Sequence, residues 1–580
     1  MPRPVDRLRA TLTPEWIEPA AIPADADLAA LHANRLVARV LYARGVTDPA
    51  AARAFIDSRP AAPPSPWELP NMEEAAERVT QALDAEETVA IFGDYDADGV
   101  TSAALLTRAL RHHLGPDRIV TLLPEREEGY GVSLRGVGDA ARAGATLLIA
   151  VDCGSNDHAA VGAARKAGMD VVVLDHHQIA GDPPEDAVVV SPQLGGDPAY
   201  RDLTGVGIAW LLVSAMAHNG VTIADPPAKT ERGYLDLVAI GTVADVSPLL
   251  GINRSIVRDG VAVLRQSIRP GLRALAEQAG RAMPTLTTED ISFAIAPRLN
   301  AAGRLGSPRL AYDLLMADDP ASAQMLAIEL ERVNRQRKSL AAAIEEQAVE
   351  RILALPDWDD WPVLMASGTD WPAGMVGTVA AKISEASGRP AILFQACADG
   401  VLAGSARSIP GVDITAHLAQ LDHLLIRHGG HSGAAGLSLT QEHFEEFAEE
   451  LAMLVLAGEA EIPAPALLPI DADVEPGDIS QETVTALAAL EPCGRDNAIP
   501  NVRIRGARMV EYATMGSAND HLKIRVLHGD RTLDCVFWGA AHRSRELLKA
   551  RSVDIVGTLG INTWRNRSRL QLDVKDFRAR

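Results

Sequence analysis

Cysteine is scarce in this sequence, and the few that occur form no pattern. The four are Cys153, Cys397, Cys493 and Cys535, spread over 580 residues with no CxxC pair among them. This spacing argues against a disulfide framework and against a cysteine-rich zinc site. A reducing cytoplasm is therefore the location we expect.

Long apolar runs are missing as well. No run approaches the roughly 20 residues that a helix needs to cross a bilayer, so we expect no membrane partner. The opening stretch MPRPVDRLRATLTPEW has no apolar core, which argues against a signal peptide. With 47% hydrophobic and 23% charged residues, the composition is typical of a soluble globular protein, and its length predicts three or four domains.

Positive charge is absent from one stretch and concentrated in the next. The formal net charge is −22, and no Lys or Arg lies between Arg427 and Arg495. From Asn501 to Arg580, by contrast, 16 Lys and Arg residues outnumber 8 Asp and Glu residues, a local net charge of +8. The sequence therefore predicts an acidic body that ends in a basic module, and such a module favours a polyanionic partner.

Apolar runs and helical patterns alternate in the first half of the chain. This alternation is typical of the α/β class with a mostly parallel, doubly wound sheet. We expect strands at TVAIF, RIVTLLP, ATLLIAV, MDVVVL and DAVVVS, and helices at VTSAALLTRALRHHL, AAVGAARKAG, GVGIAWLLVSAMA and RGYLDLVAIGTVADV.

The second half of the chain changes its pattern three times. No Gly or Pro occurs from Ala321 to Leu355, which predicts one long connecting helix. WPVLMASG opens a smaller α/β unit, and EIPAPALLPIDADVEP is typical of a linker. The short strands after it predict a small β-barrel, with the OB-fold as first choice.

These patterns divide the chain into five expected segments. They are an N-terminal helical and extended segment (1–70), a catalytic α/β domain (71–270), a linker with the long helix (271–355), a substrate-binding α/β domain (356–460) and a nucleic-acid-binding barrel (461–580).

The stretch GDYDADGVTS, at Gly93–Ser102, places three aspartates at alternate positions. An EF-hand calcium loop begins in the same way, but it needs a bidentate Glu at its twelfth position, which here is Leu105. It also needs a preceding helix, whereas TVAIF predicts a strand. For one such motif alone, a polar turn that caps a helix is the plain alternative.

Further acidic and imidazole residues follow other apolar segments. They are Asp152 after one strand, Asp175, His176 and His177 after another, and Asp245 after an apolar helix. Ligands bind at the carboxyl ends of strands in open α/β sheets, so we expect these groups to meet the first motif at one edge. Crowded carboxylates need cations, and two metal ions sharing a bridging Asp would suit phosphoester hydrolysis. The ligand types favour Mn²⁺, with Mg²⁺ as the alternative. Taken singly, His176 or Asp245 could equally be structural.

Nine stretches resemble one family in both content and order. They are GDYDADGVTS, LPEREEGYG, VDCG, LDHH, GTVADVSPL, APRLNAAGR, GMVGTVAAKI, GSARS and GGHSGAAG. On these motifs the chain resembles the DHH phosphoesterases and, within that superfamily, the RecJ family of exonucleases. The resemblance implies 5′→3′ hydrolysis of single-stranded DNA in recombination and repair. It also implies a helicase and a single-strand-binding protein as partners, and we expect a monomer.

The resemblance assigns the metal ligands residue by residue. It implies that Asp96 binds one ion, that Asp98 binds the other and that Asp152 bridges the two. His176 and Asp245 would complete the second site.

Two neighbouring positions are less firmly assigned. The resemblance implies that His177 lies beside the scissile phosphate, as a ligand or a proton-transfer group, so His177 and Asp152 are the expected catalytic residues. Asp94 would be a further ligand or a support for the others. Phe92 stands where many relatives carry a histidine ligand, four residues before Asp96, so we predict weaker metal binding at the first site.

A second set of residues is expected to hold the substrate. In the family the DHHA1 domain binds the 5′-terminal phosphate, and the matching residues here are Ser405, Arg407 and His431. Glycine allows a backbone to approach a phosphate, and arginine offers a bidentate fork, although such motifs seen alone are most often turns.

Other cationic and aromatic residues are candidates for contacts along the strand. Arg126, Arg298 and Arg304 are expected phosphate contacts, although each alone is more often an ion-pair residue. Trp564, in the polar turn NTWRNRSR, is expected to stack on a base. Trp538, in the apolar stretch VFWG, is expected in the core.

Two other functions fit part of the pattern. A phosphoesterase for oligoribonucleotides, cyclic dinucleotides or polyphosphate would share the acidic site but would need neither the long connector nor the basic module. A non-catalytic scaffold that binds single strands would use the modules but not the intact acidic and imidazole set.

Overall fold

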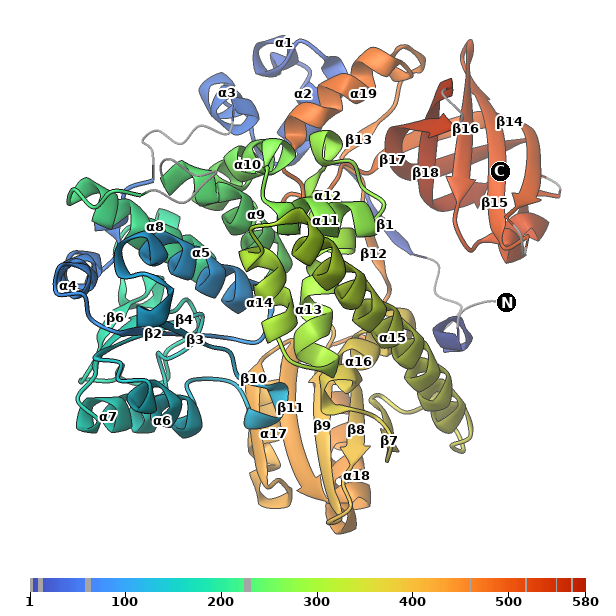
Figure 1. The fold of residues 1–580 in the computed structure, drawn as a ribbon. Coiled ribbons are helices and arrows are strands. Elements are labelled where there is room, and N and C mark those ends of the chain that lie inside the picture. Colours follow the sequence, from blue (N-terminus) through green and yellow to red (C-terminus); the bar gives the residue numbers. More distant parts are fainter. Residues whose placement is uncertain are drawn as a thin grey trace. The chain divides into compact units, whose positions relative to one another are not determined.

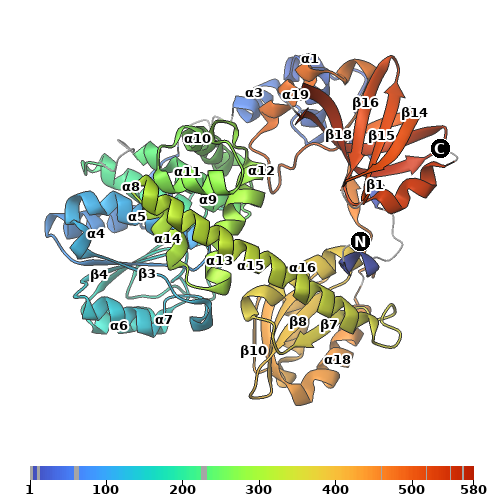
Figure 2. The ribbon, with the colours of Figure 1, turned by 45° about the vertical axis from the view of Figure 1, so that its right-hand side comes forward.

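The computed structural model describes residues 4–8, 14–57, 64–223, 231–458, 460–516, 519–548, 550–564 and 567–580 (Figures 1 and 2). The chain forms two compact units. Unit A comprises Ala54–Arg337 and Leu490–Ala498, and unit B comprises Met1–Arg53, Lys338–Ala489 and Ile499–Arg580. Among the described residues, no helix has the length and apolar character needed to span a membrane.

Unit A is built on a parallel sheet with the strand order β3-β2-β4-β5-β6. The strands are β2 (Val89–Gly93), β3 (Ile119–Leu122), β4 (Leu147–Val151), β5 (Asp170–Leu174) and β6 (Val188–Val190). Gly93 lies opposite Val151, and Val151 lies opposite Leu174, so three neighbouring strands end in register. The residues that follow these strands therefore emerge side by side at one edge of the sheet.

Helices cover both faces of this sheet, which confirms the predicted doubly wound α/β fold. One face carries α4 (Met72–Asp84), α5 (Ala97–Leu114) and α8 (Gly205–His218), and the other carries α6 (Leu134–Arg142) and α7 (His158–Lys166) (Figure 2). Strand residues alternate between the faces: Ile91 packs with the first set of helices, and Phe92 packs with the second. Each fully buried Leu or Ile contributes about 1.5–3 kcal/mol.

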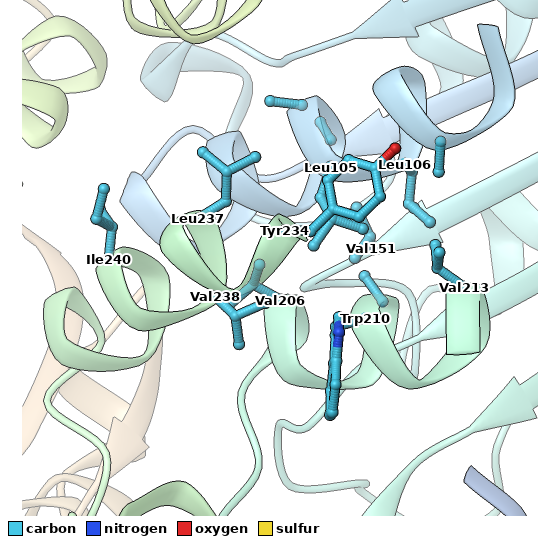
Figure 3. Close-up of a cluster of buried hydrophobic side chains, with 14 of the residues drawn as sticks. Leu105, Leu106, Val151, Val206, Trp210, Val213, Tyr234, Leu237, Val238 and Ile240 are labelled. Atoms are coloured by element: carbon cyan, nitrogen blue, oxygen red, sulfur yellow. The ribbon is translucent and has the colours of Figure 1, made fainter. Parts of the chain in front are cut away.

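A helical region follows the sheet and ends in one long helix. Its members are α9 (Leu235–Ala244), α10 (Gly251–Gln266), α11 (Pro270–Gln278), α12 (Thr288–Asp290), the π-helical turn η9 (Ile291–Ile295), α13 (Ala296–Leu305) and α14 (Arg309–Met316). Side chains of α9 meet those of α5 and α8 around Val151 in a buried cluster (Figure 3). The predicted long helix is α15 (Pro320–Leu353), and it contributes residues to both units.

Unit B contains a mixed sheet with the strand order β10-β11-β9-β8-β7. The strands are β7 (Leu364–Gly368), β8 (Ala391–Ala396), β9 (Val401–Arg407), β10 (Arg427–His431) and β11 (Ala434–Thr440). Leu402 and Leu437 on one face pack with α17 (Ile414–Gln420) and α18 (Phe444–Leu456). On the opposite face, α16 (Ala373–Ser387) covers β8 and β9.

Unit B also contains the predicted small barrel. Its strands are β14 (Val502–Met515), β15 (His521–His528), β16 (Arg531–Phe537), β17 (Ser552–Trp564) and β18 (Arg567–Ala579), and the short helix η14 (Ala541–Leu547) follows β16. The strands pair in the order β14-β15-β16-β18-β17, and β14 also pairs with β17, which closes the barrel.

The terminal segments of unit B differ from the prediction. The stretch expected to be only a linker contains β12 (Leu467–Pro469) and β13 (Ala472–Asp473), and β12 pairs with β1 (Glu15–Ile17) near the N-terminus. Proline is tolerated in short edge strands, so a proline-rich sequence concealed them. The remaining helices are α1 (Leu28–Leu31), α2 (Arg35–Ala43), α3 (Pro49–Asp57) and α19 (Gln481–Leu487). The boundaries of the five expected segments stay a prediction.

Candidate metal centre and phosphate-binding surface

The loop after β2 combines a helix cap with an unsatisfied carboxylate. Asp96 Oδ1 accepts hydrogen bonds from the backbone N–H groups of Asp98 (2.9 Å) and Gly99 (3.1 Å), so Asp96 caps α5. Helix capping is the alternative role considered for this motif. It uses Oδ1 and leaves Oδ2 of Asp96 to bind a metal ion. Asp94 is buried, and its Oδ1 has no hydrogen-bond partner among the described residues.

Asp98 faces the N-terminal end of another helix. Its carboxylate accepts hydrogen bonds from the N–H groups of Gly205 (2.8 Å) and Val206 (3.0 Å) at the start of α8. Asp98 Oδ2 lies 3.9 Å from His176 Nε2, which places it at the edge of the cluster. These bonds give Asp98 a structural role beside the predicted role of metal ligand.

Asp152 lies at the centre of the acidic cluster. It follows β4 with a φ of 62°, an uncommon conformation for a residue other than glycine. Its Oδ1 lies 3.1 Å from His176 Nε2. A Cβ atom at Gly205 would come within 2.7 Å of the Asp152 Cβ, so the start of α8 packs directly on this residue. The surrounding backbone therefore fixes Asp152 in its strained conformation.

Two groups of side chains could each surround one ion. Within each group, every residue offers a ligand atom within 4.8 Å of the others. One group is Asp94, Asp96 and Asp152, and the other is Asp152, His176 and His177. Asp152 belongs to both groups, which is the arrangement expected of a bridging ligand.

The two histidines are held in different states. His177 Nδ1 lies 2.8 Å from Asp175 Oδ1. Burial alone would lower the pKa of His177, but the bond to Asp175 raises it to about 9. Burial would likewise raise the pKa of Asp175, but the bond to His177 lowers it to about 2. For His176, burial and then the neighbouring charge of His177 lower the pKa to about 4, which keeps this imidazole neutral, as a metal ligand must be.

Tyr130 is a member of the site that the sequence did not single out. Its hydroxyl donates a hydrogen bond to the backbone oxygen of Asp152 (3.1 Å) and lies 2.8 Å from His177 Nδ1. Because Nδ1 faces both Asp175 and Tyr130, the Nε2 atom of His177 is left for a ligand or substrate. The only hint in the sequence was the position of Tyr130 in LPEREEGYG.

The carboxylates crowd one another in a buried space. Burial and then the charge of Asp96 raise the pKa of Asp94 to about 8 and that of Asp245 to about 6. Burial and then neighbouring carboxylates raise the pKa of Asp98 and Asp152 well above the usual range. Such shifts show that these charges lack compensation from the protein itself. With the unpartnered Asp94 oxygen, this donor set fits divalent cations such as Mn²⁺ or Mg²⁺.

Asp245 and Phe92 lie at the margin of the cluster. Asp245 caps the C-terminal end of α9, and its Oδ2 accepts a hydrogen bond from Ser247 Oγ (2.9 Å). It belongs to neither ligand group, so its role as a ligand stays a prediction. Phe92 is buried in the apolar layer on the α6 side, where its ring packs against Gly136. The weaker binding predicted for the first site likewise stays a prediction.

The three arginines expected to contact phosphate have different surroundings in unit A. The Arg126 guanidinium lies 4.2 Å above the Tyr95 ring, and its Nε donates to Gly303 O (3.3 Å). Arg304 is half-buried, and its charge acts on Tyr95. Arg298 is 8% exposed. Its Nε lies 2.7 Å from Glu331 Oε2 and its Nη1 donates to the Ala294 oxygen (2.6 Å), so its charge is already paired with a carboxylate.

The motif APRLNAAGR, which contains Arg298 and Arg304, also supports the acidic loop. Asn300 Oδ1 accepts a hydrogen bond from the N–H of Ala97 (2.8 Å), the first residue of α5. A Cβ atom at Gly303 would come within 2.2 Å of the Tyr95 backbone oxygen, so only glycine lets this helix pack so closely against the acidic loop. Sequence reasoning identified the stretch APRLNAAGR but missed Asn300 as its link to the metal loop.

In unit B, the α16 face of the second sheet carries the other predicted residues. Ser405 and Arg407 lie on β9, and Arg407 Nη1 donates to Ser405 Oγ (2.9 Å). A Cβ atom at Gly377 of α16 would come within 2.8 Å of Arg407 Nη2, so glycine makes room for the guanidinium. His431 is exposed at the end of β10.

A cavity of about 420 Å³ opens beside Ser405. It lies between the start of α16 and strands β9, β10 and β11, and Arg427 and Gly436 are among the residues that line it. Burial lowers the pKa of Arg407, and among the described residues no carboxylate pairs with it. A phosphate group would supply the charge that the protein leaves out.

The two tryptophans of the barrel depart from expectation. Trp538 was expected in the core, but it is 55% exposed. The reason is its position one residue beyond β16, on the outward side of the barrel. The side chain of Trp564, the predicted stacking residue, lies outside the described residues.

Carboxylates and imidazoles gathered at the carboxyl edge of a parallel sheet are the arrangement expected of a metal-dependent phosphoesterase. Three family models match the chain: the DHH family N-terminal domain over residues 88–242, the DHHA1 domain over 360–456 and the RecJ OB domain over 470–576. The single-stranded-DNA-specific exonuclease RecJ of Dickeya dadantii is 35% identical over 532 residues, which cover 87% of this chain and 90% of that protein. The chain belongs to the RecJ family.

Solved structures of Thermus thermophilus RecJ are similar to this chain. RecJ in complex with Mn²⁺ aligns with a TM-score of 0.82 at 30% identity, covering 98% of this chain and 80% of that chain. RecJ in complex with Mg²⁺ aligns with a TM-score of 0.76 at 29% identity, covering 98% and 78%. The fold is therefore shared along nearly the whole chain.

Proposed function

We propose that this protein is an exonuclease that hydrolyses single-stranded DNA from its 5′ end with the help of two divalent metal ions. The observation that carries the proposal is the pair of ligand groups that share Asp152. The family relationship supports single-stranded DNA as the substrate.

Mn²⁺ is the metal we propose, with Mg²⁺ as the alternative. Asp94, Asp96 and Asp152 would hold one ion, and Asp152 with His176 would hold the other, with Asp98 and Asp245 as additional ligands. Bound in this way, the two ions would supply Lewis-acid stabilisation of the charge that develops on the phosphodiester.

The chain's own residues orient the reaction. Asp175 and Tyr130 engage His177 Nδ1. The other ring nitrogen, Nε2, would then contact the scissile phosphate or the leaving oxygen. In the metal-free protein the bond to Asp175 raises the pKa of His177 to about 9, so that Nε2 can carry a proton and donate a hydrogen bond to a phosphate oxygen. Asp152 is the central positioning carboxylate of both ligand groups.

Recognition of the strand would be divided among three regions. Ser405, Arg407 and His431 would bind the 5′-terminal phosphate at the cavity beside β9. Arg126 and Arg304 would contact phosphates close to the metal centre, whereas Arg298 would act mainly through its ion pair with Glu331. The C-terminal barrel, including Trp564, would bind the strand further along. The 5′→3′ direction and a role in recombination and repair rest on the family relationship, as do the proposed helicase and single-strand-binding protein partners.

Digestion of end-labelled DNA tests this proposal directly. We expect the purified protein with Mn²⁺ to release mononucleotides from a strand labelled at its 5′ end, and to leave a blunt duplex of the same sequence intact. Release from the 3′ end would contradict the proposed direction. Strand binding without any hydrolysis in Mn²⁺ or Mg²⁺ would instead favour a non-catalytic scaffold, and preference for cyclic dinucleotides would favour a small-substrate phosphoesterase.

A further inference from the structure

A short segment, Leu490–Ala498, belongs to unit A although the chain before and after it belongs to unit B. It reaches the chain that follows Asp245, where the N–H of Leu249 donates a hydrogen bond to the Arg495 oxygen (2.9 Å). A Cβ atom at Gly494 would come within 2.7 Å of Leu249 Cδ1, so the segment packs tightly at this point. The segment thus brings Arg495 to the margin of the metal centre.

Polar groups fix this segment at several points. The buried guanidinium of Arg254 donates to two backbone oxygens of the segment, both at 3.0 Å. Thr288 Oγ1 accepts a hydrogen bond from the N–H of Cys493 (3.2 Å). Within the segment, the buried side chain of Asn497 donates to two backbone oxygens, at 2.8 and 3.0 Å. A base held in this way carries Arg495 in a defined position, which lowers the entropy cost of using it to bind a ligand.

The guanidinium of Arg495 has only weak contacts with the protein. Its side chain is 59% exposed, and its Nε lies 4.0 Å from Oδ2 of Asp496, which is also exposed. Its Nη1 lies 3.5 Å from the Val246 oxygen, at the limit for a hydrogen bond. In the part of the chain that the structure describes, no other carboxylate lies within ion-pair distance of it. The fork of donors is therefore available to a ligand, and an arginine fork fits a phosphate group.

The backbone on both sides of this contact is strained. Val246 has a φ of 60°, and Asp496 has a φ of 59°. A positive φ is uncommon for residues other than glycine, and it is an outlier for a β-branched residue such as valine. Strain of this kind persists only where the surrounding structure enforces it, and it gathers at functional sites. The turn after Asp245 and the tip of the segment are therefore held in exact positions beside each other.

Two arginines act on two different carboxylates of the acidic cluster. Burial and then the charge of Asp96 raise the pKa of Asp245, and the charge of Arg495 opposes them. Burial and then the charge of Asp96 likewise raise the pKa of Asp94, and the charge of Arg126 opposes them. A strand bound at the metal centre would therefore meet a cation near each of these carboxylates.

We propose that Arg495 binds the phosphate that follows the scissile phosphate on its 3′ side. The proposal deepens the function proposed above and rests on it for the strand and for the direction of cleavage. In that function, the phosphate on the other side of the scissile one is the 5′-terminal phosphate, which the β9 surface of unit B would bind. The exposure of Arg495 places it at the margin of the metal centre, so its contact is with the part of the strand that remains after cleavage.

Strands with one neutral linkage test this contact in the full-length protein with Mn²⁺. Each is a short 5′-phosphorylated (dT) strand in which a methylphosphonate replaces the phosphate at the second, third or fourth linkage from the 5′ end. The first cleavage falls at the first linkage, so the second linkage carries the phosphate assigned to Arg495. The measurement is kcat/KM for release of the first nucleotide, relative to the strand that has every phosphate. For wild-type protein we expect a reduction of about tenfold at the second linkage.

Substitution of Arg495 should remove this sensitivity at one linkage only. Arg495→Ala should cleave the strand that has every phosphate about tenfold more slowly, and a neutral second linkage should slow it no further, because the contact is already lost. Its sensitivity at the third and fourth linkages should stay at the wild-type value. Arg495→Lys keeps the charge without the fork and should retain part of the sensitivity at the second linkage.

The chain offers a closely matched control at the other end of the same helix. Arg232 is 64% exposed and pairs with Asp259 at 2.6 Å. It lies in the short helix η7 (Glu231–Tyr234), which directly precedes α9, whereas Arg495 lies beside the residues that follow α9. Arg232→Ala should show the wild-type sensitivity at every linkage.

Two results would overturn the contact. One is wild-type sensitivity at the second linkage in Arg495→Ala; with a lowered Tm, it would leave Arg495 only the role of a cation that stabilises the C-terminal end of α9. The other is a loss of sensitivity at the third or fourth linkage in place of the second. Cleavage of the strand that has every phosphate by wild-type protein is scored separately. If it fails, the nuclease proposal fails, and affinities of the same strands, measured by fluorescence anisotropy with a chelator, still test whether Arg495 distinguishes the second linkage.

Discussion

The acidic edge of unit A and the glycine-rich sheet surface of unit B leave opposite charges without a partner. At the acidic edge, burial raises the pKa of Asp94 to about 8, and one of its oxygens has no hydrogen-bond partner among the described residues. On the β9 surface, burial lowers the pKa of Arg407, and among the described residues its guanidinium donates to Ser405 Oγ and the Ala406 backbone oxygen but to no carboxylate. In both places the folded chain shifts a charged group towards its neutral form.

The two regions reach this state by different architectures. Parallel strands that end in register deliver several carboxylates to one small volume, which is suited to small, highly charged cations. The second surface is one face of an antiparallel sheet. Gly429 and Gly436 have no side chains to cover the backbone there, and Arg407 on the neighbouring strand supplies one guanidinium. This arrangement is suited to one flat or tetrahedral anion. The comparison shows that each site lacks the charge of its proposed ligand: positive charge at the acidic edge, where metal ions would bind, and negative charge on the β9 surface, where a phosphate would bind.

Replacement of Asp152, the carboxylate shared by both ligand groups, should have the largest effect on activity. We expect Asp152→Asn to reduce the release of nucleotides by about a thousand-fold or more, because both ligand groups lose a member. Binding of the strand in the presence of a chelator should stay at its wild-type level. Asp157→Asn is the control, since Asp157 is a nearby carboxylate that bonds the Val132 N–H and lies outside both groups. Wild-type turnover by Asp152→Asn would contradict the metal centre.

Substitution of Arg407 should affect recognition of the 5′-terminal phosphate and little else. Arg407→Lys keeps the charge but removes the fork, and we expect the preference for a 5′-phosphate over a 5′-hydroxyl end to fall by about 10- to 100-fold. The measurement is kcat/KM for the two strands. Arg389→Lys is the control, because burial also lowers the pKa of Arg389, but its guanidinium donates to backbone oxygens away from β9. An equal loss on both strands would rule out recognition of the terminal phosphate by Arg407.

Loss of one hydroxyl beside His177 should have a moderate effect. In Tyr130→Phe the ring contact with His177 is kept, but the bonds to Nδ1 and to the Asp152 oxygen are lost. We expect kcat to fall by about tenfold with little change in KM, as is usual for residues that orient metal ligands. Tyr200→Phe removes a hydroxyl that bonds the Ser65 N–H elsewhere and should leave kcat unchanged. A change confined to KM would place Tyr130 in strand binding instead.

The smallest expected effect is a dependence of thermal stability on pH in metal-free protein. Asp94 has a pKa of about 8 in the folded state against 3.8 ordinarily, so the folded state retains a proton that the unfolded state loses. Stability should therefore fall as pH rises from about 6 to 8, by a few degrees in Tm. Mn²⁺ should restore more stability at pH 8 than at pH 6, because the metal competes with protons. Asp94→Asn should reduce the metal-free slope without abolishing it, because the raised pKa values of Asp245 and His177 act in the same direction, and an unchanged slope would remove Asp94 as a contributor.

Much of the fold followed from the sequence because it rests on local patterns. The buried strands of unit A appear in the sequence as continuous apolar runs, which revealed them. The helix α15 was revealed by the absence of glycine and proline over most of its length. The strands β1, β12 and β13 were missed because they are two or three residues long and gain their identity from partners far along the chain. Pairing of this kind leaves little trace in local composition.

The clustering of the candidate residues was predictable from the sequence, but the residues that support the cluster were not. The residues at strand ends are chemically distinctive, and the parallel topology brings Asp152, His176 and the first motif together as expected. Tyr130 and Asn300 act through contacts with residues distant in sequence, to His177 and Ala97, which no spacing reveals. The exposure of Trp538 was likewise hidden, because an apolar strand says nothing about which of its end residues lies beyond the last ladder pair.

The pairing of β1 with β12 has a consequence for the order in which the protein is made. The Trp16 indole donates a hydrogen bond to Asp576 (2.6 Å), and the two residues are separated by 560 positions. Unit A draws almost all of its chain from one continuous stretch, so it can fold while synthesis continues. The strand β1 of unit B, by contrast, gains its sheet partner only after residues 467–469 have been made, and Trp16 gains Asp576 later still. The metal-binding unit is thus the part of this protein that can mature first, whereas the unit that carries the β9 surface and the barrel needs segments that are made later.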